Sequence, residues 1–284
     1  MNLIDGKAIS AKVKAEVKDK AVELAKKGVQ PGLAVVLVGD DKASATYVAS
    51  KEKACKACEI YSLAYKLPAS TKEDELLNLI DELNNNDKIH GILVQLPLPK
   101  HIDTDKILEK IDPKKDVDGF SAVNVGRLVS GLEGFVPCTP LGVMRLLKEY
   151  GIDTKGKNAV VIGRSNIVGK PMANLLLNED ATVTITHSKT QNLDDITKKA
   201  DIIVVAIGKP NFLTSQMVKE GAVVIDVGIN RLDSGKLVGD ADFEGLKDKC
   251  KFITPVPGGV GPMTIAMLLQ NTVTSAQNHI ERQK

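Results

Sequence analysis

The chain has 284 residues, of which 43% are hydrophobic and 26% charged, a balance typical of a globular protein with one large domain or two ordinary ones. Its 38 basic and 36 acidic residues give a net charge of +2 and are spread along the sequence, so no basic stripe predicts a nucleic-acid partner. No apolar run approaches about 18 residues and the N-terminus lacks the pattern of a signal peptide, so we expect no membrane partner and a cytoplasmic location.

Hydrophobic periodicity and turn residues predict that the first half of the chain alternates helices and strands. The predicted elements are a helix over 7–27, a strand over 33–38, a helix over 44–57, a strand over 60–67, a helix over 72–83 and a strand over 89–95. This order is typical of a βαβαβ unit with a parallel sheet. Residues 98–140, which contain several glycines and prolines, are expected to form a loop-rich stretch.

The second half is expected to repeat this pattern. Its predicted elements are strands over 159–162, 181–186, 202–206 and 223–227 with a helix after each of the first three, a short hairpin or irregular excursion over 228–238, a strand over 252–253 and a closing helix over 264–279. We therefore predict an α/β fold of two lobes, the second a Rossmann-like dinucleotide-binding domain, with a cleft between them. Functional residues are expected in the loops after the strands, because ligands bind at the carboxyl ends of parallel strands.

The most informative motif is a glycine-flanked basic loop at residues 163–169, which follows an apolar strand and precedes a helix with Pro171 in its first turn. The unpaired amides and the dipole at such a helix start favour an anion. Arg164 adds a permanent cation with the fork geometry that suits a phosphate. We interpret the loop as a phosphate cradle, and the alternative is an ordinary strand-to-helix turn with a surface arginine.

The loop departs from the G-x-G-x-x-G fingerprint of dinucleotide sites. Ser165 replaces the middle glycine, Gly169 comes one residue late, and the next strand ends in His187 and Ser188 without a carboxylate. A carboxylate there would repel a 2′-phosphate, so its absence favours NADP over NAD. Whether Arg164 contacts the 2′-phosphate or the pyrophosphate is left open by the sequence.

In the first half, Tyr47 and Lys51 are one helical turn apart and share a face of the predicted helix. A lysine beside an aromatic ring and a cationic ligand loses its preference for the ammonium form and becomes a usable base. Tyr47 offers a flat surface for stacking. The alternative is a solvated lysine above a packed tyrosine.

Two further strand-end loops carry polar residues. Gln95 ends an apolar strand, where its amide would have to find hydrogen-bond partners and could orient both a lysine and a substrate carbonyl. Asp116 and Asp118 lie in a glycine turn, and they could bind a metal, cap a helix or pair with the edge of a heterocycle. The glycine- and proline-rich segment 254–264 allows a flat ligand to approach the backbone closely but supplies no acid or base.

The four cysteines are too few for a disulfide framework in a chain of this length. Cys55 and Cys58 have the C-x-x-C spacing of a redox pair or of half a zinc site. No second pair or nearby histidine completes a zinc site in the sequence, so we expect structural cysteines and no bound metal.

Six segments resemble the bifunctional methylenetetrahydrofolate dehydrogenase/methenyltetrahydrofolate cyclohydrolase family. They are YVASK at 47–51, VQLPLP at 94–99, DVDGF at 116–120, PCTP at 137–140, GRSNIVGKP at 163–171 and PVPGGVGPMT at 255–264. The resemblance implies two activities: the oxidation of 5,10-methylenetetrahydrofolate with NADP⁺, and the hydrolysis of the 5,10-methenyl product to 10-formyltetrahydrofolate. A dehydrogenase with little cyclohydrolase activity, an NAD-preferring variant and a non-catalytic nucleotide-binding regulator are the alternatives.

The resemblance also implies roles for particular residues. Lys51 is the main catalytic residue, as a base or as an electrostatic guide, Gln95 tunes it, Tyr47 stacks on the folate, and Asp118 holds the pterin edge. The remaining folate-binding residues are expected to be Ser44, Leu96, Pro97, Pro257 and Gly258, and the cofactor-binding residues Gly163, Arg164, Ser165, His187, Ser188, Ile229 and Thr264.

The predicted folate-binding catalytic domain spans residues 1–139 and is joined by the C-terminal helix 264–284, and the predicted NADP-binding domain spans residues 140–263. Tetrahydrofolate derivatives are the expected small-molecule partners. The resemblance further implies a homodimer that pairs through the cofactor domains.

Overall fold

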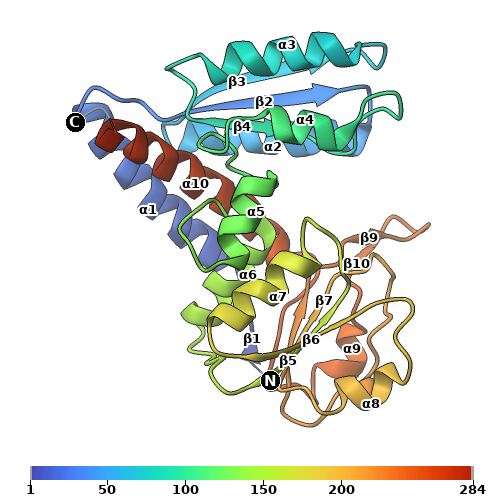
Figure 1. Cartoon of the computed structure of the whole chain (residues 1–284). Coiled ribbons are helices and arrows are strands. Elements are labelled where there is room, and N and C mark those ends of the chain that lie inside the picture. The colour runs from blue at the N-terminus through green and yellow to red at the C-terminus, as the bar shows by residue number, and fades with distance from the viewer. Residues whose placement is uncertain (1, 283–284) are drawn as a thin grey trace. The chain divides into compact units, whose positions relative to one another are not determined.

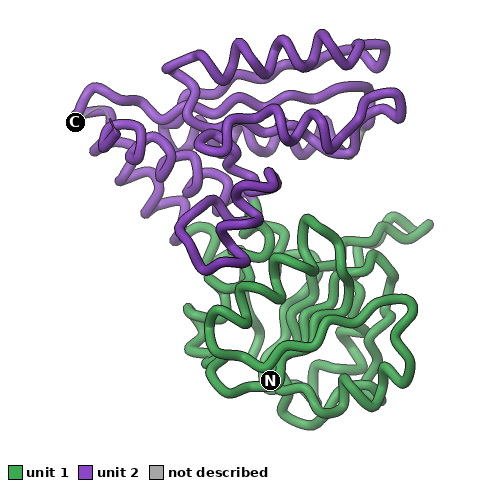
Figure 2. Tube along the Cα trace, viewed as in Figure 1, with its two compact units in different colours: residues 1–11, 137–264 green, residues 12–136, 265–284 purple. Residues whose placement is uncertain are grey.

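The computed structural model describes residues 2–282 and forms two compact α/β units, each with its own parallel sheet (Figure 1). Unit 1 contains residues 1–11 and 137–264, and unit 2 contains residues 12–136 and 265–284 (Figure 2). The predicted two-lobed α/β fold class is confirmed. Residues 1–11 were predicted to belong to the folate-binding domain but are part of unit 1, because β1 (Asn2–Leu3) pairs with β11 (Phe252–Ile253) of that unit.

Unit 2 contains the predicted βαβαβ arrangement. Its elements are β2 (Gly32–Val38), α2 (Lys42–Ala57), β3 (Tyr61–Leu67), α3 (Glu73–Asn84) and β4 (Gly91–Val94). The strand order is β3–β2–β4, with every pairing parallel, so the first strand lies between the second and the third. The topological switch point therefore lies between β2 and β4, where a parallel sheet usually binds its ligand at the carboxyl edge.

The core of unit 2 explains this arrangement. All seven residues of β2 are buried, which is why its sequence is continuously apolar rather than alternating. Leu76, Ile80 and Leu83 recur at helical spacing on α3 and pack with the sheet in one hydrophobic cluster. The long helices α1 (Gly6–Lys26) and α10 (Val260–Arg282) each begin in unit 1 and continue in unit 2, and residues 283–284 of the predicted closing helix lie outside the described residues.

Residues 98–140 are loop-rich, as expected, but they also contain helices that the sequence did not predict. This stretch contains α4 (Thr104–Lys110) and α5 (Ala122–Val129), and α6 (Cys138–Glu149) begins at its end. The side chains of Asp103 and Ser121 accept amide hydrogen bonds at the starts of α4 and α5, so each short helix has an ordinary N-cap.

Unit 1 contains a six-stranded sheet in the order β1–β11–β8–β7–β5–β6. Its remaining strands and helices are β5 (Asn158–Ile162), α7 (Gly169–Asn178), β6 (Thr182–Thr186), α8 (Leu193–Thr197), β7 (Ile202–Val205), β8 (Val223–Asp226), β9 (Asn230–Arg231), β10 (Leu237–Val238) and α9 (Phe243–Leu246). The order from β5 onward is doubly wound, with a switch point between β5 and β7.

Two local predictions in unit 1 have different outcomes. The hairpin expected over 228–238 is confirmed, because β9 and β10 pair antiparallel. The helix expected after the third strand is wrong: only a short 3₁₀ turn, η1 (Ser215–Met217), precedes β8. Among the described residues, no helix is long and apolar enough to cross a membrane.

Candidate active site

In unit 2, the loop after β4 meets the helix after β2 at the switch point. Nζ of Lys51 donates to Oε1 of Gln95 at 2.8 Å, and Nε2 of Gln95 donates to the carbonyl of Leu96, also at 2.8 Å. Since a backbone carbonyl can only accept, the second bond orients the amide so that its oxygen faces the lysine. Lys51 is only 8% exposed, whereas most lysines lie on the surface. The two residues, 44 positions apart in sequence, thus form one polar pair.

The helix that carries Lys51 also carries Tyr47 and Ser44. The side chain of Asp41 accepts from the amide of Ser44 at 2.7 Å and so caps α2. Tyr47 is 46% exposed, one turn before the buried Lys51. Its ring is therefore accessible to a flat ligand, whereas Ser44 is buried. Leu96 is half-buried and Pro97 exposed, directly after Gln95.

The two aspartates of the DVDGF segment have different surroundings. Asp116 is buried and accepts from the amides of Phe120 and Ser121 and from Nδ2 of Asn124, so it organises the loop before α5. Asp118 is half-buried in the same turn. Gly119 allows this turn, because its φ is +69° and an added Cβ would lie 2.7 Å from the carbonyl oxygen of Phe135. Asp116 therefore stabilises the turn before α5, and of the roles predicted for the pair this is nearest to helix capping.

In unit 1, the predicted phosphate-binding loop connects β5 to α7 at the switch point. Gly163 has φ +120°, and an added Cβ would lie 2.4 Å from the carbonyl oxygen of Ala206. A Cβ on Gly169 would lie 2.2 Å from the carbonyl oxygen of Gly163. Gly163 is therefore required by the close approach of the backbone after β7, and Gly169 by the loop's own backbone, which folds back on itself.

Two amides at the start of α7, which were expected to be unpaired, instead bind a side chain of the loop. The hydroxyl of Ser165 accepts from the amides of Val168 at 3.2 Å and Gly169 at 3.3 Å. Because a hydroxyl that accepts still has its own proton to donate, Ser165 presents an O–H group backed by two amides. Arg164 is exposed beside it. This arrangement suits a phosphate oxygen.

His187 and Ser188 follow β6, next to β5 in the sheet. The amide of Lys189 donates to Nδ1 of His187 at 3.2 Å, so in the neutral ring the proton is on Nε2. His187 is half-buried and Ser188 exposed, and both can offer donors to an anion.

The other predicted residues of unit 1 lie after β8 and at the start of α10. Ile229 is 47% exposed, and its Cδ1 lies 3.3 Å from the position of a Cβ built on Gly261. Thr264 is half-buried, and its hydroxyl is 2.9 Å from that of Thr139. Pro257 is exposed and Gly258 half-buried, at φ +107°.

Sequence reasoning did not include Asp226, Asp240 or Thr139 among the site residues. Asp226 and Asp240 are almost fully buried and bind backbone amides of the loops after β7 and β8. Burial raises the pKa of Asp226 to about 6, although three amides favour its ionised form. The signals in the sequence were an aspartate that ended an apolar strand, for Asp226, and the PCTP segment at 137–140, for Thr139.

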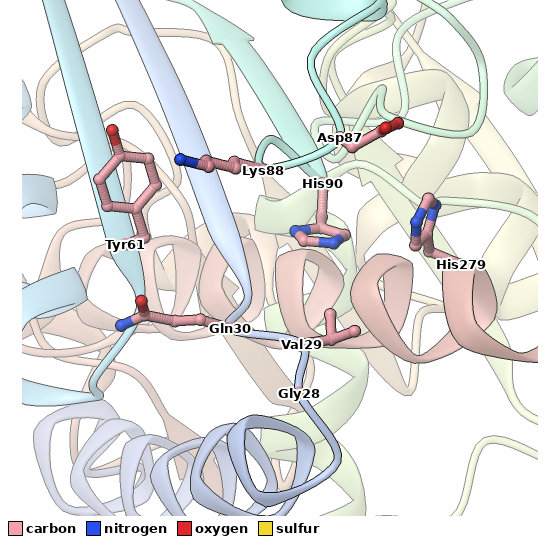
Figure 3. Close-up of a pocket in the computed structure, with 8 residues that line it drawn as sticks. All are labelled: Gly28, Val29, Gln30, Tyr61, Asp87, Lys88, His90 and His279. Carbon is pink, nitrogen blue, oxygen red and sulfur yellow. The ribbon is translucent and has the colours of Figure 1, made fainter.

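A separate cavity of about 370 Å³ lies at the amino edge of the unit 2 sheet, opposite the edge that carries Gln95 (Figure 3). It is lined by Gly28, Val29, Gln30, Tyr61, Asp87, Lys88, His90 and His279. None of the predicted folate- or cofactor-binding residues belongs to this lining, so the cavity is distinct from the Lys51–Gln95 pair.

The cysteines have no features of a redox or metal site. All four are buried and none forms a disulfide, and burial raises the pKa of the Cys55 thiol to about 12. Within residues 2–282, no three His, Cys, Asp or Glu side chains are grouped so that they could hold a metal ion.

Comparisons with known proteins identify similar sequences and folds. Residues 4–118 match the family model "Tetrahydrofolate dehydrogenase/cyclohydrolase, catalytic domain", and residues 137–280 match its "NAD(P)-binding domain". A curated relative from Campylobacter hominis, "Bifunctional protein FolD", is 75% identical over 284 residues, which are 100% of both chains.

Solved structures show the same similarity. The bifunctional FolD enzyme from Campylobacter jejuni has a TM-score of 0.97 and 62% identity, over 98% of this chain and 99% of that chain. The methylenetetrahydrofolate dehydrogenase-cyclohydrolase of Trypanosoma brucei, solved with NADP and an inhibitor, has a TM-score of 0.94 and 42% identity, over 98% of each chain.

Proposed function

This chain belongs to the tetrahydrofolate dehydrogenase/cyclohydrolase family, and on that basis we propose that it oxidises 5,10-methylenetetrahydrofolate with NADP⁺ and hydrolyses 5,10-methenyltetrahydrofolate to 10-formyltetrahydrofolate. The observation that carries this proposal is the buried Lys51, held by Gln95 at the switch point of unit 2. A lysine in that position provides the polar group that the hydrolytic step requires, beside the exposed ring of Tyr47.

The residues of unit 2 bind and orient the folate in this proposal. Tyr47 stacks on the pterin, and the carboxylate of Asp118 accepts from its donor-rich edge. Within this unit, the folate is further bounded by Ser44, Leu96 and Pro97. Lys51 faces the carbon that becomes the methenyl cation, whose charge disfavours a second cation beside it. The amine form can then take a proton from the attacking water, while Gln95 fixes its direction.

The residues of unit 1 fit NADP. When bound, the cofactor accepts the hydride that leaves the methylene carbon. The O–H of Ser165 and the guanidinium of Arg164 bind its phosphates at the loop that begins with Gly163, and His187 and Ser188 bind beside them. Ile229 and Thr264 bound the nicotinamide side. The absence of a carboxylate after β6 favours NADP over NAD.

The test follows the absorbance of the methenyl compound in wild type, Lys51→Met and Lys53→Met. Lys53 is an exposed lysine on the same helix, so its variant is a matched control. We expect wild type and Lys53→Met to hydrolyse the methenyl compound at equal rates, and Lys51→Met to lose this activity. Equal rates of methenyl hydrolysis in all three proteins would show that Lys51 does not assist this step, and only the dehydrogenase activity would remain in the proposal. A wild type that does not reduce NADP⁺ with methylenetetrahydrofolate would overturn the whole proposal.

We further propose a cytoplasmic homodimer that pairs through unit 1. The support is an exposed apolar surface on an edge of its sheet: β6 is the terminal strand, Ile185 on it is 42% exposed, and Leu177 on the adjacent α7 is 58% exposed. Light scattering after size exclusion should give twice the chain mass of 30.4 kDa for wild type and the mass of one chain for Ile185→Lys. A monomeric wild type would contradict the pairing.

A further inference from the structure

Two buried carboxylates connect the loops at the carboxyl edge of the unit 1 sheet. Oδ2 of Asp240 accepts from the amides of Ile207 at 2.6 Å and Gly208 at 2.9 Å. Its Oδ1 accepts from the amide of Lys209 at 2.9 Å and from Nδ2 of Asn230 at 2.8 Å. Asp240 is 0% exposed, so one carboxylate fixes three consecutive amides after β7 and a side chain after β8.

Asp226 holds Asp240 in place. Its Oδ1 accepts from the amides of Gly228 and Asp240, both at 2.9 Å, and its Oδ2 accepts from the amide of Ala241 at 2.8 Å. The backbone is fitted around this pair: a Cβ on Gly228 would lie 2.3 Å from Cγ of Asp240, and one on Gly239 would lie 1.8 Å from Oδ2 of Asp226. The two aspartates therefore form a unit with little freedom to move.

These contacts surround the positions assigned to the cofactor. Residues 207–209 follow β7, one of the two strands that flank the switch point, and Gly163 lies directly against Ala206 of the same strand end. Ile229 lies between Gly228, which binds Asp226, and Asn230, which binds Asp240. The exposed Ile229 is therefore fixed on both sides by the carboxylate pair.

We infer that Asp240, supported by Asp226, is a positioning residue for NADP⁺: it holds the 207–209 loop and Ile229 in the conformation that receives the nicotinamide half of the cofactor. This inference rests on the proposed function of unit 1 as the cofactor site. Ionised acceptors make hydrogen bonds roughly twice as strong as neutral ones, so the negative charge of Asp240 suits the binding of four donors. Its effect on the reaction passes through the cofactor and not through Lys51, which belongs to unit 2.

The test compares Asp240→Asn with Asn230→Ala and with a control, Asp201→Asn. Asparagine offers one acceptor oxygen where Asp240 has two, and its NH₂ group would face amides that also donate. Asn230→Ala removes one of the four donors and keeps the carboxylate. Asp201 lies just before β7, at the opposite end of that strand, where it binds the amide of Asn158 and Nζ of Lys219. It thus tests the same change of residue at the other end of the strand whose following loop Asp240 binds, away from the cofactor loops.

We expect Asp240→Asn to raise the KM for NADP⁺ and the calorimetric Kd about ten-fold or more, the equivalent of one lost charge-assisted hydrogen bond. Asn230→Ala should give a smaller rise in the same direction. The KM for methylenetetrahydrofolate and the rate of methenyl hydrolysis, which needs no cofactor, should be unchanged in both variants. Asp201→Asn should leave all these constants unchanged.

Three outcomes would overturn the inference. The first is that Asp240→Asn binds NADP⁺ with the same affinity as a wild type that does bind it. Another is an equal loss of NADP⁺ binding in Asp201→Asn, which would indicate general destabilisation of unit 1. The third applies if Asp240→Asn fails to fold: Asn230→Ala, checked by its circular dichroism spectrum, then decides alone, and unchanged NADP⁺ binding in it overturns the inference. A wild type that does not bind NADP⁺ would instead refute the proposed function.

Discussion

The buried His90 predicts a specific loss of stability in mild acid. Its Nδ1 accepts from the amide of Gly32 at 3.1 Å, at the start of the central strand β2, so the neutral ring has its proton on Nε2. Protonation of Nδ1 would place two N–H groups face to face. His90 is only 4% exposed, and the ring of His279 lies edge-on at 5.4 Å between centroids (Figure 3). Burial is the largest cause that lowers the pKa of His90 to about 4 from an ordinary value of 6.5.

The sign and size of the effect follow from this shift. The unfolded chain takes up a proton near pH 6.5 and the folded chain near pH 4, so the unfolded state binds more protons between these values. The stability contributed by neutral His90 is therefore complete above pH 6.5 and is lost as the pH falls through that window. The linkage relation gives a loss of about 2 kcal/mol by pH 5 and about 3 kcal/mol near pH 4.

The assay is urea unfolding followed by far-UV circular dichroism at pH 7.5 and pH 5, because the chain has no tryptophan for fluorescence. His90→Asn is the matched variant, since its side-chain oxygen can still accept from Gly32 but does not titrate. We expect the free energy of unfolding to fall by about 2 kcal/mol more in wild type than in the variant between these pH values. Equal changes in the two proteins would refute the assignment of the buried neutral ring.

Other variants test the loops and the cofactor site. Arg164→Ala should raise the KM for NADP⁺ far more than that for NAD⁺, measured by steady-state kinetics with both cofactors, and equal effects would contradict contact with the 2′-phosphate. Gly163→Ala should lower the free energy of unfolding of unit 1 by about 2 kcal/mol or more, because its φ of +120° and the carbonyl of Ala206 leave no place for a Cβ. Gly126→Ala, inside α5 with open space around it, should raise the melting temperature, since alanine is favoured over glycine in a helix by about 0.5–1 kcal/mol.

Elements with strong local signals were predictable from the sequence. The buried strands are runs of β-branched and other apolar residues bounded by turns, and β2 and β5 begin one residue before the predicted starts. The short helices α4 and α5 were missed because each has fewer than three turns, which gives the periodicity little length in which to show. Where a helix was expected after β7, the amides of residues 207–209 bind the carboxylate of Asp240, more than thirty residues downstream, and local sequence does not reveal such a contact.

The sequence also predicts part of the candidate site, namely the residues with distinctive side-chain chemistry, but not the contacts that side chains make to backbone amides. Lys51 was predicted from the helix face that it shares with Tyr47, and Gln95 and Arg164 from their places after strands. The hydrogen bond from Lys51 to Gln95 agrees with the predicted orienting role of the amide. The contacts of Ser165 and Asp116 were not predictable, because each depends on which backbone amides a turn presents. Neither residue type specifies such a partner by sequence spacing alone.

The two units share one topological principle, and this connects the fold to both candidate sites. In each sheet the first strand of the α/β series lies between the second and the third, so the chain leaves the centre in two directions. In unit 2 the loops at this switch point bring Lys51 to Gln95, and in unit 1 they bring the 163–169 loop to the loop held by Asp240. In each unit the strand order thus determines which loops meet, and the side chains on those loops determine what the site can bind. Residues that secure those loops, as Asp240 and Asp226 do, are therefore expected to affect ligand affinity without touching the ligand.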